Sequence, residues 1–509
     1  EEPVTEDIFI LPGLIDAHIH VESSMLIPSE FARLAVVHGT VGTVSDPHEI
    51  ANVLGVSGVK FMIENGNSVP FKFNFGAPSC VPATPFETAG AELGIEEVEA
   101  LLQMPEIKYL SEMMNFPGVL YNDPVVMAKI AAAKKAGKPV DGHAPGVTGE
   151  NAGKYIAAGI STDHECFTIE EAHEKIGFGM KILIREGSAA RNFETLYPLI
   201  DEFPDHVMLC SDDKHPDDLA AGHINILIKR AIAKGLDFFN ILRSCTLNPV
   251  KHYSLDIGLL QPGDTADFIL VNNLDEFKVV ATYIDGVMAA EEGKTLIPHV
   301  SAIPCNNFNI GTVRNTDIRV VPEGDLMRVL QAFEGQLITG LILAAPFIQN
   351  NQVVSDTGND ILKLVVKNRY YESPAAVGFI NNFGIKRGAL ASCVAHDSHN
   401  IVAIGADDES IAEAINLVIS AKGGISLVDG DEKLLLPLPF AGIMSGSNGI
   451  EVASLYEQMD KQARSMGSTL EAPYMTLSFM ALLVIPNLKL SDKGLFDGTC
   501  FAFTDLFVK

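Results

Sequence analysis

The chain has 509 residues, a length that predicts two or three domains, and its 36 basic and 65 acidic residues give a net charge of -29. This charge repels phosphate backbones and anionic membranes, so we expect a small-molecule substrate and neither a nucleic-acid nor a membrane partner. The 47% hydrophobic and 20% charged residues are typical of a soluble globular protein. Seven cysteines without regular spacing indicate reduced thiols and a cytoplasmic location.

The most informative motif is a pair of histidines at the end of residues 12–20, which read Pro-Gly-Leu-Ile-Asp-Ala-His-Ile-His. The apolar residues before the pair predict a buried strand, in which side chains two positions apart point the same way. His18 and His20 therefore converge, as two ligands of a divalent metal would. A bare His-x-His is more often a hydrogen-bonded pair, but the Pro-Gly turn and Asp16 favour a metal site.

From residue 11 to about residue 249, short apolar runs alternate with amphipathic stretches, and each run ends in polar side chains. Eight such units recur about every 20–35 residues, with helices predicted over 125–136 and 225–234. The later apolar runs are 41–44, 71–75, 107–110, 139–140, 159–160, 180–184 and 207–210. This α/β pattern predicts a TIM-like (β/α)₈ barrel over residues 12–250. A doubly wound sheet is the alternative, but the Gly-rich phosphate loop that usually opens such a sheet is missing.

Two further units are predicted beside the barrel. Residues 1–11 and 251–305 are expected to form a small β-sandwich module, with strands within 258–271, 281–284 and 286–290. Residues 306–509 are expected to form a C-terminal α/β domain. Its predicted strands and helices are 362–366, 401–404, 425–428, 410–421 and 449–465.

A polar cluster in this last domain, His-Asp-Ser-His-Asn at 396–400, has two interpretations. It is either a lid over the mouth of the barrel or a turn that satisfies its own backbone. We favour the turn.

All strand ends of a barrel open on one face, so side chains that follow different strands can meet there. The candidate metal ligands at these ends are His18, His20, Glu112, His143, His164 and Asp212. Four imidazoles and two carboxylates suit one or two ions such as zinc, manganese or iron. We expect Glu112 to bridge two ions, with His18 and His20 on one ion and His143 and His164 on the other.

A metal pair lowers the pKa of bound water and so provides hydroxide at neutral pH. Asp212 is predicted to act both as a ligand and as the general base that takes a proton from this hydroxide. Its neighbour Asp213 is the rival for that role. Asp212 is preferred because it stands nearer to the apolar strand.

Other polar side chains at the strand ends are candidates for contact with the substrate. Asp46, His48 and Glu49 follow the second strand and are predicted to deliver a proton to the substrate and leaving group, although a helix cap with solvated charge would have the same pattern. Arg185 and Ser188 follow the seventh strand. Either they bind polar atoms of the substrate or they belong to an internal salt bridge.

These motifs resemble the amidohydrolase superfamily, whose members pair a metal-bearing barrel with a small β-sandwich, and more narrowly the adenine deaminases of bacteria and archaea. The segments that carry the likeness span essentially the whole chain: 16–24, 46–49, 79–82, 112–114, 141–146, 185–192, 211–213 and 395–400. The resemblance implies attack of a metal-bound hydroxide on C6 of adenine, which yields hypoxanthine and ammonia. It also implies a binuclear centre of manganese, iron or zinc held by the six ligands named above. We expect a homo-oligomer, a dimer or larger.

Two features depart from the family pattern. Family members carry an N-terminal stretch that adds strands to the β module, whereas residues 1–11 precede Pro12 here, so we expect a fragment or strands supplied from elsewhere. Mononuclear barrel deaminases have a glutamate three residues after the strand-five histidine. This chain has Gly146 there, so Glu49 or His48 is the expected proton donor.

Two other functions stay open at this point. A cyclic-amide hydrolase of the hydantoinase or dihydroorotase type commonly bridges its metals with a carboxylated lysine from strand four. Here that strand ends in Glu112, and Lys108 is near its start. A non-catalytic barrel that serves as a binding module is disfavoured by the complete set of ligands.

Overall fold

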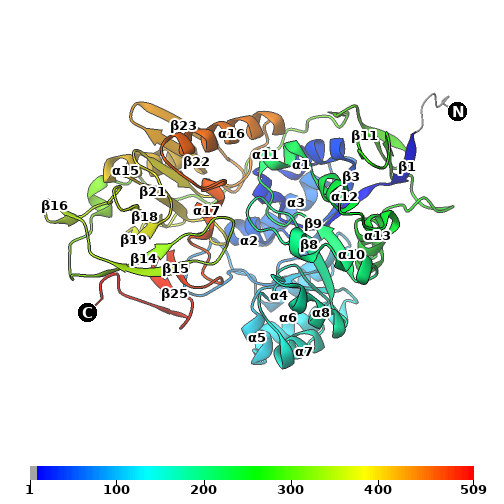
Figure 1. The fold of residues 1–509 in the computed structure, drawn as a ribbon, viewed down its shortest axis with the longest axis horizontal. Helices are drawn as coiled ribbons and strands as arrows, with labels where there is room; N and C mark the ends of the chain where they lie inside the picture. Colours follow the sequence, from blue (N-terminus) through cyan, green and yellow to red (C-terminus); the bar gives the residue numbers. More distant parts are fainter. Residues whose placement is uncertain (1–7, 509) are drawn as a thin grey trace.

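The computed structural model describes residues 8–508. A barrel built from the first half of the chain lies beside a second α/β unit built from the last third, and a small sheet that includes β1 and β11 lies at the far side of the barrel (Figure 1). No helix in the described part of the chain is long and apolar enough to cross a membrane.

Eight parallel strands form the barrel wall. Hydrogen bonds join β2 to β6 in one sheet and β7 to β9 in another, and the bridges Val140–Ile160 and Ile19–Asp212 join the two sheets at both seams. The strands are β2 (Leu14–Ile19), β3 (Thr40–Ser45), β4 (Lys72–Ala77), β5 (Ile107–Met113), β6 (Val140–Gly142), β7 (Thr162–Asp163), β8 (Lys181–Arg185) and β9 (Val207–Cys210). The predicted (β/α)₈ barrel is confirmed, and its closure excludes the doubly wound sheet.

Asp16 helps to close this barrel. Its buried carboxylate accepts hydrogen bonds from the backbone N–H groups of His18, at 3.2 Å, and Ser211, at 3.0 Å. The other carboxylate oxygen lies 2.8 Å from His223 Nε2. The second ring nitrogen of His223, Nδ1, contacts Thr40 Oγ1 at 2.7 Å. Asp16 thus links the first barrel strand to the last and fixes the backbone that carries the histidine pair.

Helices connect the strands around the outside of the barrel. The predicted helices at 125–136 and 225–234 are present as α6 and α12, each displaced by one residue. Asp123 caps helix α6, because its side chain accepts hydrogen bonds from two backbone N–H groups, and Pro124 is at the first helical position. The helices are α1 (Pro28–Ala35), α2 (His48–Leu54), α3 (Val56–Gly66), α4 (Ile95–Leu102), α5 (Phe116–Leu120), α6 (Pro124–Lys135), α7 (Gly149–Ala157), α8 (Ile169–Gly177), α9 (Phe193–Leu196), α10 (Leu199–Glu202), α11 (Pro216–Ala221), α12 (Ile224–Ala233), α13 (Phe238–Ser244) and α14 (Leu247–Tyr253).

The small β module is, among the described residues, a single five-stranded sheet whose neighbouring strands run antiparallel. Its order is β1 (Phe9–Pro12), β10 (Phe268–Val271), β11 (Val279–Ile284), β12 (Val287–Glu291) and β13 (Lys294–Thr295). Thr282 in β11 donates a hydrogen bond to the backbone carbonyl of Val36, at 2.7 Å, so the sheet is anchored on the barrel. The part of this module predicted at residues 1–7 lies outside the described residues.

The C-terminal unit is built on an eight-stranded, mostly antiparallel sheet in the order β15-β14-β19-β18-β21-β20-β22-β23. Helix α15 (Asp408–Ala421) packs on one face, and α16 (Gly449–Ser465) and α17 (Pro473–Phe479) pack on the other. Because α16 also packs on α11, the two units share an interface. The strands are β14 (Met327–Gln331), β15 (Gly340–Ala344), β18 (Ile361–Lys367), β19 (Ala376–Asn381), β20 (Ala389–Ser392), β21 (Ile401–Gly405), β22 (Gly424–Asp429) and β23 (Glu432–Pro437), with small sheets β16 (Ile348–Gln349) and β17 (Gln352–Val353), and β24 (Leu488–Ser491), β25 (Gly494–Asp497) and β26 (Ala502–Phe503).

Candidate metal centre

The structure brings all six predicted ligands together at the carboxyl ends of the barrel strands. The two histidines of the opening motif lie at the end of β2, with ring centroids 4.9 Å apart, as their spacing predicts. The other four come from β5 and from the residues just after β6, β7 and β9. The six are His18, His20, Glu112, His143, His164 and Asp212, and each is at most 8% exposed.

Glu112 lies between two sets of imidazoles. One carboxylate oxygen is 3.4 Å from His20 Nε2. The other is 2.9 Å from His143 Nδ1 and 3.2 Å from His164 Nε2. Although burial opposes ionisation, His143 and His164 hold the pKa of Glu112 well below its usual range. A carboxylate that faces different histidines with each oxygen has the geometry of a bridging ligand.

Asp212 faces the opening histidine pair from the last strand. Its Oδ1 is 3.2 Å from His20 Nε2 and 3.5 Å from His18 Nε2. Burial opposes its charge, but Arg185 and these histidines hold the pKa of Asp212 well below its usual range. Asp212 has a φ of 60°, an uncommon conformation for a non-glycine residue, and backbone hydrogen bonds to β2 hold it there.

The arrangement fits divalent metal ions. Several groups of three or four side chains offer ligand atoms within 4.8 Å of one another, among them His18 with His20 and Asp212, and His18 with Glu112 and His164. Both ring nitrogens of His18 and Nε2 of His143 are buried without a hydrogen-bond partner. Leaving such atoms unpaired costs about 1–3 kcal/mol each, which a bound ion would offset. His18 belongs both to the group with His20 and Asp212 and to the group with Glu112 and His164. Its pairing with His20 on one ion therefore stays a prediction.

The predicted proton-transfer residues at the end of β3 are also part of this cluster. Asp46 accepts a hydrogen bond from the backbone N–H of His48 at 3.1 Å, and its other oxygen lies 3.1 Å from His48 Nδ1. His48 Nε2 is 3.5 Å from Glu49. All three side chains are buried, so a cap followed by solvated charge is not what the structure shows. Their role in proton transfer stays a prediction.

Two family models match the sequence. The model of the amidohydrolase family matches residues 9–289, and that of the adenine deaminase C-terminal domain matches residues 336–502. Adenine deaminases from Methanosarcina mazei and Salinibacter ruber are each 56% identical to this chain, over 98% of this chain and 92% of the relative. The chain belongs to the adenine deaminase family. A solved beta-aspartyl dipeptidase from Fervidobacterium islandicum also matches, with 17% identity and a TM-score of 0.43 over 57% of this chain and 85% of that chain.

Arg185 in this adenine deaminase family member forms the internal salt bridge, the second of its two interpretations. Its guanidinium donates to Asp212 Oδ2 at 2.5 Å and to Glu165 Oε2 at 2.9 Å, and the side chain is buried. Ser188 does not line the cavity at the metal centre. Its hydroxyl donates to Asp218 at 2.5 Å and accepts from the backbone N–H of His215 at 2.9 Å, so its predicted contact with substrate has no support in the geometry.

Glu165 is a residue of the centre that the sequence analysis did not single out. One of its oxygens lies 3.5 Å from both His143 Nδ1 and His164 Nε2, so it is a further candidate ligand. Glu165 directly follows His164 at the end of β7, and this position could have identified it as a candidate ligand from the sequence. Asp213, the rival general base, accepts a hydrogen bond from Ser23 at 2.5 Å, and burial raises the pKa of Asp213.

The polar cluster 396–400 of the C-terminal unit lies over the barrel mouth. His396 Nδ1 and His399 Nε2 both contact the carboxylate of Glu49, the latter at 2.5 Å. The cluster also bonds to itself, because the His399 N–H donates to the Ala395 carbonyl at 2.8 Å. The turn is thus folded against Glu49 of the barrel and covers the centre. The prediction of a self-contained turn is wrong.

The cavity above the metal centre is small and is closed by apolar side chains of the C-terminal unit. Its volume is about 30 Å³, and Leu337, Phe479, Leu482 and Val484 line the side away from the barrel. An adjoining cavity of about 410 Å³ shares Arg185 and Leu337 with it. Leu337 thus stands between the two spaces.

Lys489 holds two residues of this apolar cover in place. Its buried amino group donates to the backbone carbonyls of Leu337, at 2.7 Å, and Phe479, at 2.9 Å. Burial lowers the pKa of Lys489 from 10.5 to about 7. Between these values the unfolded chain binds a proton that the folded chain does not, so the free energy of unfolding rises with pH in this window and falls as pH drops towards 7.

We therefore expect Lys489→Met to remove a pH dependence of up to about 1.4 kcal/mol per pH unit from the free energy of unfolding between pH 7.5 and 9.5. Urea unfolding of both proteins across this range measures it. Lys493→Met, on the exposed turn of the same hairpin, should leave the slope unchanged. Parallel curves for the wild type and Lys489→Met would contradict the assignment.

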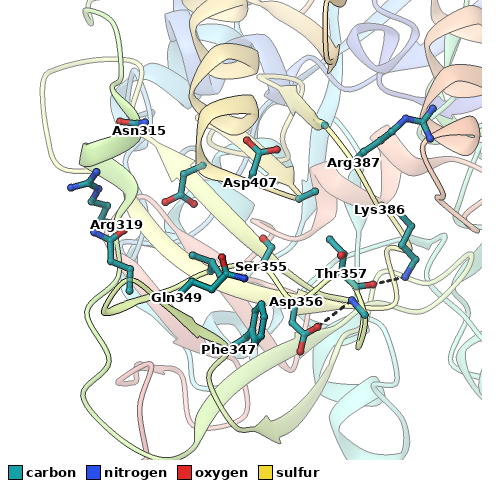
Figure 2. A pocket seen from close by; sticks show the side chains of 16 residues that line it. Asn315, Arg319, Phe347, Gln349, Ser355, Asp356, Thr357, Lys386, Arg387 and Asp407 are labelled. Atoms are coloured by element: carbon teal, nitrogen blue, oxygen red, sulfur yellow. Dashed lines mark hydrogen bonds between the residues drawn. The ribbon is translucent and has the colours of Figure 1, made fainter.

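A larger cavity lies in the C-terminal unit, but its chemistry is not that of an active site. Its volume is about 740 Å³, and Figure 2 shows charged side chains around it. Lys386 donates to the Thr357 carbonyl at 2.7 Å, Asp356 accepts from the Gly358 N–H at 3.1 Å, and Asp407 caps α15. These groups serve the local fold and do not converge on a common point.

Proposed function

We propose that the chain catalyses the hydrolytic deamination of adenine to hypoxanthine and ammonia, with two divalent metal ions at the Glu112 centre. Manganese or iron is the first choice of metal, and zinc is the alternative. The observation that carries the reaction is the likeness to adenine deaminases over 98% of this chain. The position of Glu112 between two sets of histidines supports the binuclear centre.

The metal ions would be held by the histidines and carboxylates that the barrel strands bring together. Their binding atoms are buried, and several have no other partner. When bound, a pair of divalent ions lowers the pKa of water and supplies a nucleophile at neutral pH. The proposed ligands are His18, His20, Glu112, His143, His164 and Asp212.

Asp212 is proposed as the base that receives the proton of this nucleophile. Arg185 holds one of its oxygens, Oδ2, at 2.5 Å. The other oxygen, Oδ1, faces His18 and His20 and is the atom to which we assign proton transfer. Fixing one oxygen in this way orients the other, which is what a general base requires.

The amino group that leaves needs a proton, and the opposite side of the cluster can supply one. Asp46 Oδ2 lies 3.1 Å from Nδ1 of His48, and His48 Nε2 points towards Glu49 and towards Asp397 Oδ1, at 3.6 Å. We assign proton donation to His48, because the two carboxylate oxygens of Glu49 are engaged by His396 and His399. Hydroxide adds to C6, the donor protonates the amino group, and the C6–N bond breaks to release ammonia. The hydroxide proton that Asp212 takes then moves to a ring nitrogen of hypoxanthine.

The cyclic-amide hydrolase alternative receives no support from the geometry. Its bridging group would be a carboxylated lysine, but the position between the histidines is occupied by Glu112. Lys108 lies near the opposite end of β5. The complete, buried cluster likewise argues against a non-catalytic barrel.

Ammonia release tests the proposal. The full chain, loaded with manganese, is incubated separately with adenine, adenosine, cytosine and dihydroorotate. We expect ammonia from adenine only. Ring opening of dihydroorotate would favour the cyclic-amide hydrolase, and a metal-loaded protein that is inert towards all four compounds would favour the binding module.

A further inference from the structure

Two polar atoms of the C-terminal unit face the cavity without a partner. His396 and Asp397 are 2% and 3% exposed, and both line the cavity at the metal centre. His396 Nε2 and Asp397 Oδ2 have no hydrogen-bond partner. Buried polar atoms left unpaired in this way are costly unless a ligand completes them.

His396 is held so that its free nitrogen faces the cavity. Its Nδ1 is bound to Glu49, which leaves Nε2 as the only atom available to a ligand. The closest acidic oxygen to Nε2 belongs to Asp213, at 3.9 Å, which is beyond hydrogen-bond distance. The imidazole ring also stacks on Phe479, with centroids 5.2 Å apart and an angle of 23° between the planes. Ring orientation and ring position are therefore both fixed.

Glu49 is in turn held by a second histidine of the same turn. His399 Nδ1 accepts the backbone N–H of Ala395 at 3.2 Å, so the proton of this ring is on Nε2, which donates to Glu49 at 2.5 Å. Each oxygen of Glu49 is thus bound by one histidine of the C-terminal unit. Glu49 and His399 act on His396 as positioning residues.

We propose that His396 and Asp397 are the residues that recognise adenine, and this rests on the proposed function. Adenine presents ring nitrogens and N–H groups along the edge of a flat, apolar ring. Although burial opposes its charge, Glu49 and Asp213 raise the pKa of His396 to about 9, so Nε2 carries a proton in addition to the one that Nδ1 donates to Glu49. Nε2 therefore donates to a ring nitrogen of adenine, and Asp397 Oδ2 accepts from an N–H group. The apolar cover supplied by Leu337, Phe479 and Leu482 suits the faces of the ring. The barrel thus provides the reacting groups, and the C-terminal unit provides the selection of the base.

Two substitutions of His396 test the roles of Nδ1 and Nε2 separately. In His396→Asn the amide can replace Nδ1 towards Glu49 but does not reach the position of Nε2, whereas the longer His396→Gln does reach it. We expect kcat/KM for adenine to fall about 10- to 100-fold in His396→Asn and to recover partly in His396→Gln. Asp397→Asn should cause a loss of similar size. His173→Asn, at an exposed histidine paired with Glu202, is the control and should have no effect.

Deaza analogues then identify the contact. Inhibition constants of 1-, 3- and 7-deazaadenine are measured against the wild type and His396→Asn, and the penalty for one missing ring nitrogen should disappear in the variant. Unchanged penalties for all three analogues, or wild-type kcat/KM in His396→Asn and Asp397→Asn, would overturn the proposal. Loss of bound metal in either variant would also overturn it, because the residue would then serve the metal centre. A wild-type enzyme inert towards adenine would instead contradict the proposed function itself.

Discussion

Replacing Glu112 with glutamine is expected to lower the metal content below two ions per chain and to reduce kcat/KM for adenine at least about 100-fold. The carboxylate presents one oxygen to His20 and the other to His143 and His164. An amide of the same shape presents an N–H₂ group, which cannot bind a metal ion, to one of these sides. Elemental analysis and ammonia release measure the two effects.

Glu87→Gln is the matched control for this substitution. Glu87 is also buried, and burial together with Asp397 raises the pKa of Glu87 well above its usual range. This shift favours the uncharged carboxyl group, so a neutral amide is a close substitute. The metal content of Glu87→Gln should equal that of the wild type. Two ions per chain in Glu112→Gln would show that Glu112 does not bridge.

Asp212→Asn is expected to reduce kcat about 10²- to 10⁴-fold, because an amide oxygen cannot take the proton that the proposed base receives. Arg185 still has Glu165 as a partner in this variant, at 2.9 Å, so its guanidinium is not left without a carboxylate. Single-turnover deamination of adenine measures the chemical step. Metal content is determined in parallel, since Asp212 is also a proposed ligand.

Asp213→Asn decides between the two candidate bases. Asp213 binds the Ser23 hydroxyl, and an amide oxygen can accept the same hydrogen bond. We expect Asp213→Asn to keep much more activity than Asp212→Asn. The reverse order would assign the base to Asp213.

The positions of the six ligands could be predicted from the sequence because they follow from local rules. Side chains two apart on a strand share a face, which places His18 and His20 together. The carboxyl ends of barrel strands share one rim, which adds the other four ligands: Glu112, His143, His164 and Asp212. Neither rule needs the details of side-chain packing. The alternation of apolar runs and helices likewise predicted the barrel.

The cover of the site could not be predicted in this way. Glu49 and His396 are 347 positions apart, and their contact depends on how the C-terminal unit packs on the barrel. No local pattern encodes such packing, so the turn at 396–400 looked self-contained. The role of Lys489 could not be predicted for the same reason. Its two partners are backbone carbonyls of distant segments.

The directions of individual side chains at the strand ends could not be predicted from the sequence either. Arg185 ends β8 and Ser188 follows it, yet Arg185 turns to Asp212 and Glu165 while Ser188 turns to Asp218. The available carboxylates decide these directions, and their positions emerge only from the fold. The native metal, the homo-oligomer and the cytoplasmic location stay predictions.

Metal titration of the full chain tests the central claim most directly. Protein stripped of metal with a chelator receives increasing manganese, and the conversion of adenine to hypoxanthine is followed by absorbance at each step. We predict no turnover without metal and a rate that rises to a plateau at two ions per chain. Turnover by the stripped protein, or a plateau at one ion per chain, would contradict a binuclear centre built around Glu112.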